Sequence, residues 1–389
     1  MGAWPLTAEE FLARLIGFDT VSSRSNMALI DFVAGYLSSL GIEVEIIASE
    51  DGKKANLLAT IGPEGKAGVI LSGHTDVVPV EGQDWSSDPF SMLVKDGRYY
   101  GRGTADMKGF IAAVLSSVPR FLENDLKVPL HLAFSYDEEV GCTGVASMIE
   151  RLAERRPRPR LCIVGEPTEM QLVVMHKGVR DYVTQVKGRE AHSSRTDKGV
   201  SAIFYAARLI RFLEELGIEL ATRADPQSLA EPPYTTISVG VVEGGQAVNI
   251  IPGSCRFEWD TRLLPGLDEN EVVDRFTRYA EEEVLPEMQA RFKGAAITTE
   301  RHALVPGLAP EDGSPAEELV LSLLKTNART GVSYATEAGH FQGIGIPTIV
   351  CGPGNILQAH RPDEYLDADQ LRQCEGFLTT LATRLAQPL

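Results

Sequence analysis

Short apolar segments alternate with helical patterns over the first 180 residues, and this alternation constrains the fold more than any other feature of the chain. Residues 68–73 (GVILSG) have the composition of a buried strand, and the same texture returns after residue 304. Strands that alternate with helices form an α/β layer around a mainly parallel sheet. The expected strands are 42–47, 56–62, 68–73, 129–139, 161–167 and 347–352, and the expected helices are 8–18 (with a capping box from Thr7 to Glu10), 26–40, 108–123, 143–155, 314–327 and 367–385.

Residues 181–303 have a different texture, which predicts a second domain inserted into the first. Several of its segments alternate polar and apolar residues, which is typical of antiparallel strands. Two helices are expected at 199–216 and 268–284. A chain of 389 residues is also too long for one ordinary hydrophobic core. We therefore expect an α/β domain with a mainly parallel sheet at 1–180 and 304–389, and an inserted α+β domain with an antiparallel sheet at 181–303.

Charge and cysteine content narrow the class of protein. The net charge of −17 disfavours nucleic acid or an anionic membrane surface as partner, because both need basic patches. The five cysteines are widely spaced and include no CxxC pair, which indicates reduced thiols instead of a disulfide framework or a zinc ribbon. The first 18 residues lack the basic and apolar regions of a signal peptide, so we expect a cytoplasmic protein.

Polar residues stand where the expected strands end, as in LSGHTDVV, where two of them follow a buried strand at strand spacing. The ends of parallel neighbouring strands converge at one edge of a sheet, which is where ligands bind. Carboxylates crowded there repel one another unless a cation compensates, and mixed imidazole and carboxylate ligands suit zinc, cobalt or manganese. The residues are His74, Asp76, Asp106, Glu138, Glu139, Glu166 and His360, enough for two metal ions.

Other interpretations of these residues exist. Each one alone is typical of a solvated strand end or turn, but all of them would have to coincide to explain the whole set. The segment GRGTAD also matches five residues of a dinucleotide-binding fingerprint. Its sixth residue is Asp106 where a glycine is expected, and a carboxylate there would repel a pyrophosphate. The residues therefore favour a metal site, with His74 as a ligand and Asp76 fixing its tautomer.

The chain resembles the M20 metallopeptidase family of dinuclear zinc aminoacylases and carboxypeptidases over essentially its whole length. The resemblance rests on SGHTDVVP, DGRYYGRGTADMKGFIAA, SYDEEVGCTG, GEPT, GREAHSS and CGPGNILQAHRPDEY, in this order. It implies that His74, Asp106 and Glu166 hold one zinc ion. Asp106 would bridge to a second zinc, held also by Glu139 and His360.

The resemblance also implies roles outside the ligand set. Glu138 would be the general base, and Asp76 would orient the first histidine ligand. His192, in the inserted domain, would polarise the scissile carbonyl. Asn249 and Arg262 would hold the substrate carboxylate, although Arg262 equally fits a solvent-facing strand position. His340 receives no role from the resemblance.

Within the family, GRGTADMKGF, HKGVR and TEAGHFQ are most similar to the acetylornithine deacetylase branch. This similarity implies hydrolysis of N2-acetyl-L-ornithine to L-ornithine and acetate, a step of arginine biosynthesis. N-succinyl-diaminopimelate, N-acetylcitrulline and peptides with a cleavable C-terminal residue are alternative substrates that the ligand set does not separate. A catalytically silent metal-binding scaffold is a further alternative, but binding alone needs neither Glu138 nor His192.

Two structural features follow from the same resemblance. The peptide bond after Asp106 would be cis, and two inserted domains would pair about a two-fold axis, so that His192 reaches the cleft of the neighbouring subunit. The helix expected at 199–216 has an apolar stripe, but such a stripe usually faces the sheet of its own domain. The stripe consists of Ile203, Ala206, Ala207, Ile210 and Leu213.

Overall fold

The structure, a computed structural model, describes residues 6–389. Residues 1–5 lie outside the described residues, and they include the start of the 18-residue segment in which no signal peptide is expected. The described chain forms two compact units. The first unit contains the residues up to Met175 together with Leu308–Thr330 and Thr336–Leu389, and the inserted unit contains His176–Gly307 and Gly331–Ala335.

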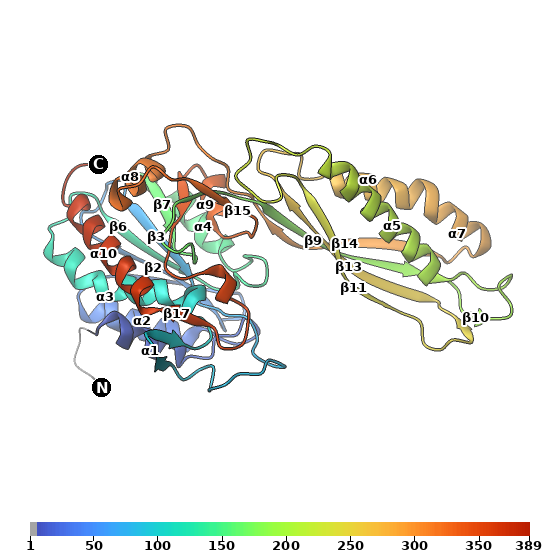
Figure 1. The fold of residues 1–389 in the computed structure, drawn as a ribbon, viewed down its shortest axis with the longest axis horizontal. Coiled ribbons are helices and arrows are strands. Elements are labelled where there is room, and N and C mark those ends of the chain that lie inside the picture. Colours follow the sequence, from blue (N-terminus) through green and yellow to red (C-terminus); the bar gives the residue numbers. More distant parts are fainter. Residues whose placement is uncertain (1–5) are drawn as a thin grey trace. The chain divides into compact units, whose positions relative to one another are not determined.

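The first unit is built on a mixed sheet whose centre is parallel, in agreement with the α/β class predicted from the sequence (Figure 1). Its four central strands, β6, β3, β7 and β16, run parallel, and antiparallel strands flank them. The order is β1 (Val44–Ala48), β2 (Ala55–Ile61), β6 (Leu130–Ser135), β3 (Val69–His74), β7 (Leu161–Val164), β16 (Thr348–Val350) and β8 (Val173–His176). Strand β15 (Thr330–Val332) completes the order, and its last two residues belong to the inserted unit.

Helices cover both faces of this sheet. On one face, side chains such as Leu71 and Phe134 share a core with α1 (Ala8–Ile16), α2 (Met27–Ser39), α3 (Gly109–Glu123), α8 (Pro315–Leu324) and α10 (Ala368–Leu385). The helices α4 (Ala146–Glu154) and α9 (Ala338–Gly343) pack on each other, and α9 contacts β7 and β16. The capping box predicted for α1 is confirmed, since Glu10 N–H donates to Thr7 Oγ1 at 3.2 Å and Thr7 N–H donates to Glu10 Oε2 at 2.8 Å.

Three very short strands of the first unit were not expected. They are β4 (Leu93–Lys95), β5 (Arg98–Tyr100) and β17 (Tyr365–Asp367), which form a small antiparallel sheet. Segments of three residues are too short to show a period of two, so their sequence carries no strand signal. The strand expected at 129–139 also ends earlier, at Ser135, because Asp137 adopts a positive φ of 56° and turns the chain.

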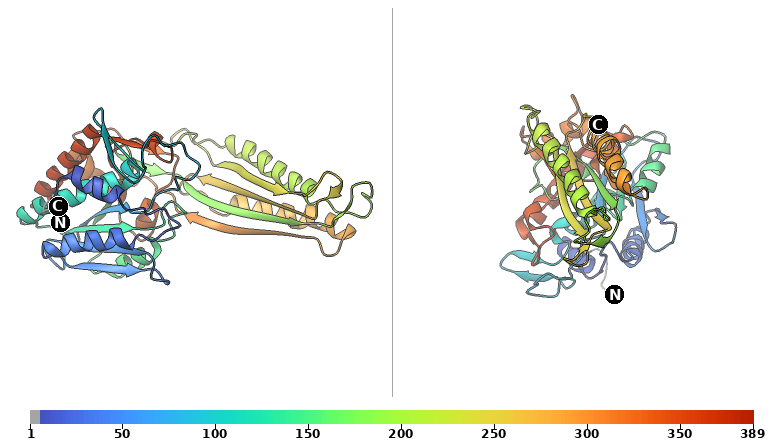
Figure 2. Two further views of the ribbon diagram at one scale, coloured as in Figure 1. Left: turned by 90° about the horizontal axis from the view of Figure 1, so that it is seen from below. Right: turned by 90° about the vertical axis from the view of Figure 1, so that its right-hand side faces the viewer.

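The inserted unit is an antiparallel sheet with helices on one face, and both Figure 1 and Figure 2 show this layering. The strand order is β11 (Thr236–Gly244), β13 (Ser254–Leu263), β9 (Gly178–Lys187) and β14 (Ala296–Val305). Alternate residues of β13, such as Phe257 and Trp259, are buried against the helices, and Trp259 stacks on Tyr182. The helices are α5 (Ala202–Ala221), α6 (Glu271–Tyr279) and α7 (Leu285–Arg291), with a π-helical turn η2 (Ala280–Val284) between the last two.

The apolar stripe predicted on α5 is partly wrong. Ala206 and Leu213 are buried, but Ile203 and Ala207 are exposed. The helix turns its other apolar side to the sheet, and this buried side includes Tyr205, Leu209, Leu216 and Leu220. Within residues 6–389, no helix combines the length and the apolar character needed to cross a membrane.

Candidate metal centre

His74 is the last residue of β3, and the sheet places it at the edge where parallel strands end. It lies opposite Ser135, the last residue of neighbouring β6, and its side chain is 1% exposed. Nδ1 of His74 donates to the main-chain carbonyl of Asp76 at 2.9 Å. This bond puts the remaining lone pair of a neutral ring on Nε2, which faces the carboxylates of the cluster.

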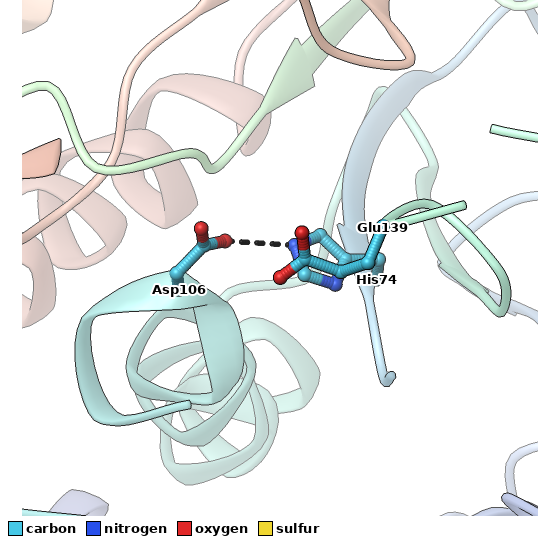
Figure 3. A group of neighbouring side chains, drawn as sticks. All are labelled: His74, Asp106 and Glu139. Carbon is cyan, nitrogen blue, oxygen red and sulfur yellow. Dashed lines mark hydrogen bonds and ion pairs between the residues drawn. The ribbon is translucent and has the colours of Figure 1, made fainter. Parts of the chain in front are cut away.

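Asp106 lies between the two histidines of the cluster. It comes from η1 (Thr104–Lys108), directly before α3, and its peptide bond to Met107 is cis, as expected. Oδ1 of Asp106 lies 2.9 Å from Nε2 of His74 (Figure 3). Oδ2 lies 3.4 Å from Nε2 of His360. The two oxygens of one carboxylate therefore face two different imidazoles, which is the arrangement required of a bridging ligand.

The other acids divide between the two histidines. Glu166, just after β7, has Oε1 at 3.7 Å from Nε2 of His74. Glu139, in the loop after β6, has Oε2 at 2.9 Å from Nε2 of His360. The ligand atoms of His74, Asp106 and Glu139 all lie within 4.8 Å of one another, so the two groups are adjacent. The structure thus brings together all five residues that were predicted as metal ligands.

The carboxylate of Asp76 makes its hydrogen bonds with groups other than His74. This carboxylate lies 3.6 Å from Nδ1 of His74, whereas the main-chain carbonyl of Asp76 lies 2.9 Å from the same nitrogen. The carboxylate oxygens instead accept the hydroxyl of Ser22 at 2.7 Å and the main-chain N–H groups of Glu138 and Glu139 at 3.1 and 3.3 Å. Asp76 therefore fixes the backbone that presents both acids, a contact that the sequence did not suggest.

Glu138 shares the cluster without contacting His360. It lies within 4.8 Å of His74 and Glu166, and the thiol of Cys142 donates to its Oε1 at 3.5 Å. Burial raises the pKa of Glu138 well above its usual range, and the charges of Glu139 and Asp106 raise it further. A carboxylate with a raised pKa is a stronger base, so Glu138 has the property required of a proton acceptor.

The electrostatics of the cluster fit divalent cations. Burial and the charge of Asp106 raise the pKa of Glu139 to about 7 and that of Glu166 well above its usual value. Hydrogen bonds to Asp106 and Glu139 raise the pKa of His360 to about 10. In addition, Oε1 of Glu166 is buried without a hydrogen-bond partner. The cluster is therefore short of positive charge, and oxygen and imidazole donors of this kind suit zinc.

The inserted unit holds the remaining predicted residues, and it separates Arg262 from the other two. His192 belongs to β10 (Ala191–His192), which pairs with β12 (Ile250–Ile251), next to Asn249. Arg262 lies near the other end of β13, where it pairs with Val179 and forms an ion pair with Asp260 at 2.7 Å. His192 and Asn249 are thus at one end of the inserted sheet and Arg262 is at the other.

The family can now be assigned from sequence comparison. The model of peptidase family M20/M25/M40 matches residues 70–384. The chain belongs to this family. Among its M20 relatives, the acetylornithine deacetylase of Proteus mirabilis (strain HI4320) is 37% identical over 350 residues, which cover 90% of this chain and 87% of that protein. The acetylornithine deacetylase of Pasteurella multocida (strain Pm70) is 36% identical over 382 residues and 96% of each chain.

Solved structures show the same fold at lower identity. The M20 metallo-carboxypeptidase Sso-CP2 from Sulfolobus solfataricus has a TM-score of 0.78 at 18% identity and covers 98% of this chain and 100% of its own. Human carnosine dipeptidase 1 has a TM-score of 0.75, also at 18% identity, over 98% and 97% of the two chains. This M20 chain therefore has the two-unit family fold, while these structures carry no information on its substrate.

Two buried acids near the metal centre of this M20 chain were missed in the sequence. Glu364 accepts hydrogen bonds from the backbone N–H groups of Ala105 and Asp106. Glu337, directly before α9, is 1% exposed, and burial raises its pKa to about 7 in spite of the neighbouring Ser135. Both lie inside motifs already singled out, HRPDEY and TEAGHFQ, and membership of these motifs was the available signal. His340 lies on α9, and its N–H donates to the carbonyl of Glu337.

Proposed function

We propose that this M20 chain is a dinuclear zinc amidohydrolase that converts N2-acetyl-L-ornithine and water into L-ornithine and acetate, as a step of arginine biosynthesis. The observation that carries the proposal is the division of the Asp106 oxygens between His74 and His360. The relatives named acetylornithine deacetylase, at 36–37% identity over 90% or more of the chain, support the choice of substrate.

Five residues would hold two zinc ions per subunit. His74, Asp106 and Glu166 would bind one ion, and Asp106, Glu139 and His360 would bind the other. Cobalt or manganese suits the same donors. When bound, the two cations lower the pKa of a water molecule and neutralise charge that develops on the carbonyl oxygen.

Glu138 would move the proton in this reaction. It accepts a proton from the attacking water, whose oxygen forms a bond to the acetyl carbon. It then delivers that proton to the amide nitrogen as the carbon–nitrogen bond breaks, so that acetate and a free amine leave. Asp76 keeps Glu138 in place through the bond from the Glu138 N–H at 3.1 Å.

His192 would stabilise the negative charge on the carbonyl oxygen. The main-chain N–H of Ser194 donates to Nδ1 of His192 at 3.2 Å, and the Ser194 hydroxyl lies 2.9 Å from the same atom. Since an N–H group only donates, Nδ1 accepts, and a neutral ring carries its proton on Nε2. That exposed Nε2–H can donate to an oxyanion. Asn249 and Arg262 would bind the substrate carboxylate, and because they lie at opposite ends of the inserted sheet, they would do so from different subunits.

We further propose a homodimer formed by the inserted units. Strand β11 is an edge of the inserted sheet, and edge strands present unpaired N–H and carbonyl groups to a partner. Apolar side chains are exposed on this strand, at Val241 and Val242, and on α5, at Ile203 and Phe204. An edge strand paired with its own copy about a two-fold axis would cover these groups.

A cytoplasmic location is also proposed, because all five cysteines are free and buried and none pairs in a disulfide. The proposed activity is tested by removing metal with a chelator and measuring hydrolysis of N-acetylornithine before and after zinc or cobalt is returned. Loss and recovery of ornithine release support the proposal. Full activity of the metal-free protein would refute the metal mechanism, and inactivity toward every acyl amino acid would favour a silent scaffold.

A further inference from the structure

Glu364 is buried and makes its hydrogen bonds with the segment that carries Asp106. Its side chain is 1% exposed. Oε1 accepts the main-chain N–H groups of Ala105 and Asp106, at 2.9 and 3.1 Å. Oε2 accepts the N–H of Gly103 at 3.0 Å and a guanidinium N–H of Arg102 at 2.8 Å. One carboxylate thus accepts three backbone N–H groups within four residues, including the N–H of Asp106, the proposed bridging ligand.

The backbone at residues 103–106 is shaped to receive an anion. Gly103 has a positive φ of 86°, and a Cβ atom there would lie 2.8 Å from Val77, so the turn requires glycine. Backbone N–H groups that converge in such a turn bind negative charge. Those of Gly103, Ala105 and Asp106 converge on Glu364, whereas the N–H of Thr104 donates to the carbonyl of Gly101 at 3.2 Å. Removal of the Glu364 carboxylate would leave these buried donors unsatisfied, and the turn would rearrange to find other acceptors.

Arg102 extends the same network to His360. One guanidinium nitrogen of Arg102 donates to the carbonyl of Arg361 at 3.3 Å. The other donates to the carbonyl of Pro79 at 3.4 Å and to the side-chain oxygen of Gln83. The amide of Gln83 in turn donates to the carbonyl of His360 at 3.0 Å. His360 has a left-handed backbone with φ of 62°, so its position depends on such contacts.

A purely stabilising role does not account for the buried ion pair between Arg102 and Glu364. Buried ion pairs contribute little net stability, because the cost of removing both charges from water offsets their attraction. The bonds of Glu364 instead converge on Asp106, whose oxygens must face His74 and His360 at once. The network therefore connects the two segments whose relative position decides whether one carboxylate can serve both metal ions.

We propose that Glu364 is the positioning residue of the metal centre, holding the Asp106 turn against the His360 segment so that Asp106 can bridge two ions. This inference rests on the proposed function, because it takes the metal-binding roles of Asp106 and His360 from it. Substitution of a residue that orients metal ligands weakens metal binding by about 10- to 100-fold. We expect a loss of that size when Glu364 is changed.

The test is a competition titration of zinc between a chromophoric chelator and metal-free protein, for wild type and Glu364→Gln. Gln preserves the size of the side chain but loses the charge and turns an NH2 group toward backbone donors. The matched control is Asp367→Asn, three residues later, whose ion pair with Arg98 at 2.9 Å is exposed and makes no contact with the Asp106 turn. We expect weaker zinc binding in Glu364→Gln and wild-type binding in Asp367→Asn.

A second variant separates positioning from loss of folding. The double substitution Arg102→Met with Glu364→Gln leaves no buried charge unpaired, so it is expected to restore thermal stability but not zinc affinity. Two zinc ions bound with wild-type affinity by either folded variant would overturn the inference and leave the proposed function intact. Failure of the wild type to bind zinc would overturn the proposed function and the inference together.

Discussion

Two inactive variants of the chain, Glu138→Ala and His192→Ala, are expected to restore activity when they are unfolded and refolded together. The geometry of the inserted sheet is the reason. Arg262 pairs with Val179, whereas His192 follows the opposite end of β9, which is marked by Lys187. The eight residue-to-residue steps from Val179 to Lys187 correspond to about 26 Å of strand. An acyl amino acid is much shorter, so it cannot contact both residues of one subunit.

The expected recovery can be calculated from random association. Half of the dimers are then mixed, and one of the two sites in each mixed dimer combines an intact Glu138 with an intact His192 from the partner, so the mixture should reach about a quarter of wild-type activity. Loss of a general base costs about 10²-fold or more, and loss of an oxyanion donor costs about 10²- to 10³-fold. The mixture should therefore exceed either parent by roughly 25-fold or more.

The assay is release of ornithine from N-acetylornithine, with native mass spectrometry to verify that mixed dimers form. A matched control pairs Glu138→Ala with Glu139→Ala. Both residues lie in the first unit, so every site of that mixed dimer keeps one defect and no recovery is expected. Mixed dimers of Glu138→Ala and His192→Ala that remain inactive would refute action of His192 across the dimer.

Three further results are expected. Glu138→Ala should keep both zinc ions and lose about 10²-fold or more in kcat, whereas Glu139→Ala should lose zinc at one site, and equal zinc loss in both variants by elemental analysis would contradict these roles. In metal-free protein the pKa of Glu337 is raised from 4.5 to about 7, so its contribution to the free energy of unfolding is full below pH 4.5 and is lost as pH rises to about 7. In urea unfolding, Glu337→Gln should lose less of its free energy of unfolding between pH 4.5 and about 7 than the wild type does. The same pH dependence in both proteins would contradict a raised pKa of Glu337. Chelation should lower the Tm of the wild type and returned zinc should restore it, since ligands that bind the folded state stabilise it, and a Tm indifferent to zinc would argue against a site in the folded protein.

Periodicity and strand-end chemistry predicted most of what positions the metal centre. The buried segment 68–73 became β3, and the polar residues after β3, β6 and β7 converge because those strands are parallel neighbours. The β4, β5 and β17 sheet was missed because three-residue strands show no period. The exposed face of α5 was misjudged because several apolar residues lie on both sides of the helix.

The parts of the site that the sequence did not reveal depend on tertiary contacts. Glu364 bonds to residues about 260 positions earlier, and no local pattern encodes such a pairing. Asp76 was expected to orient His74 through its carboxylate. The carboxylate lies 3.6 Å from Nδ1 of His74, and it also accepts hydrogen bonds from the Glu138 and Glu139 backbone in the loop after β6. In both cases the residue type was noticeable in its motif, but its partner was defined only by the fold.

The most direct test of the proposed function is the ratio of kcat/KM values of the zinc-loaded protein for a panel of acyl amino acids. The panel contains N-acetylornithine, N-acetylcitrulline, N-succinyl-diaminopimelate and a dipeptide with a free C-terminal carboxylate. We predict the highest kcat/KM for N-acetylornithine, with Glu138→Ala inactive on every substrate. A higher kcat/KM for the succinylated substrate or the dipeptide would contradict the proposed deacetylase function while leaving the metal centre in place.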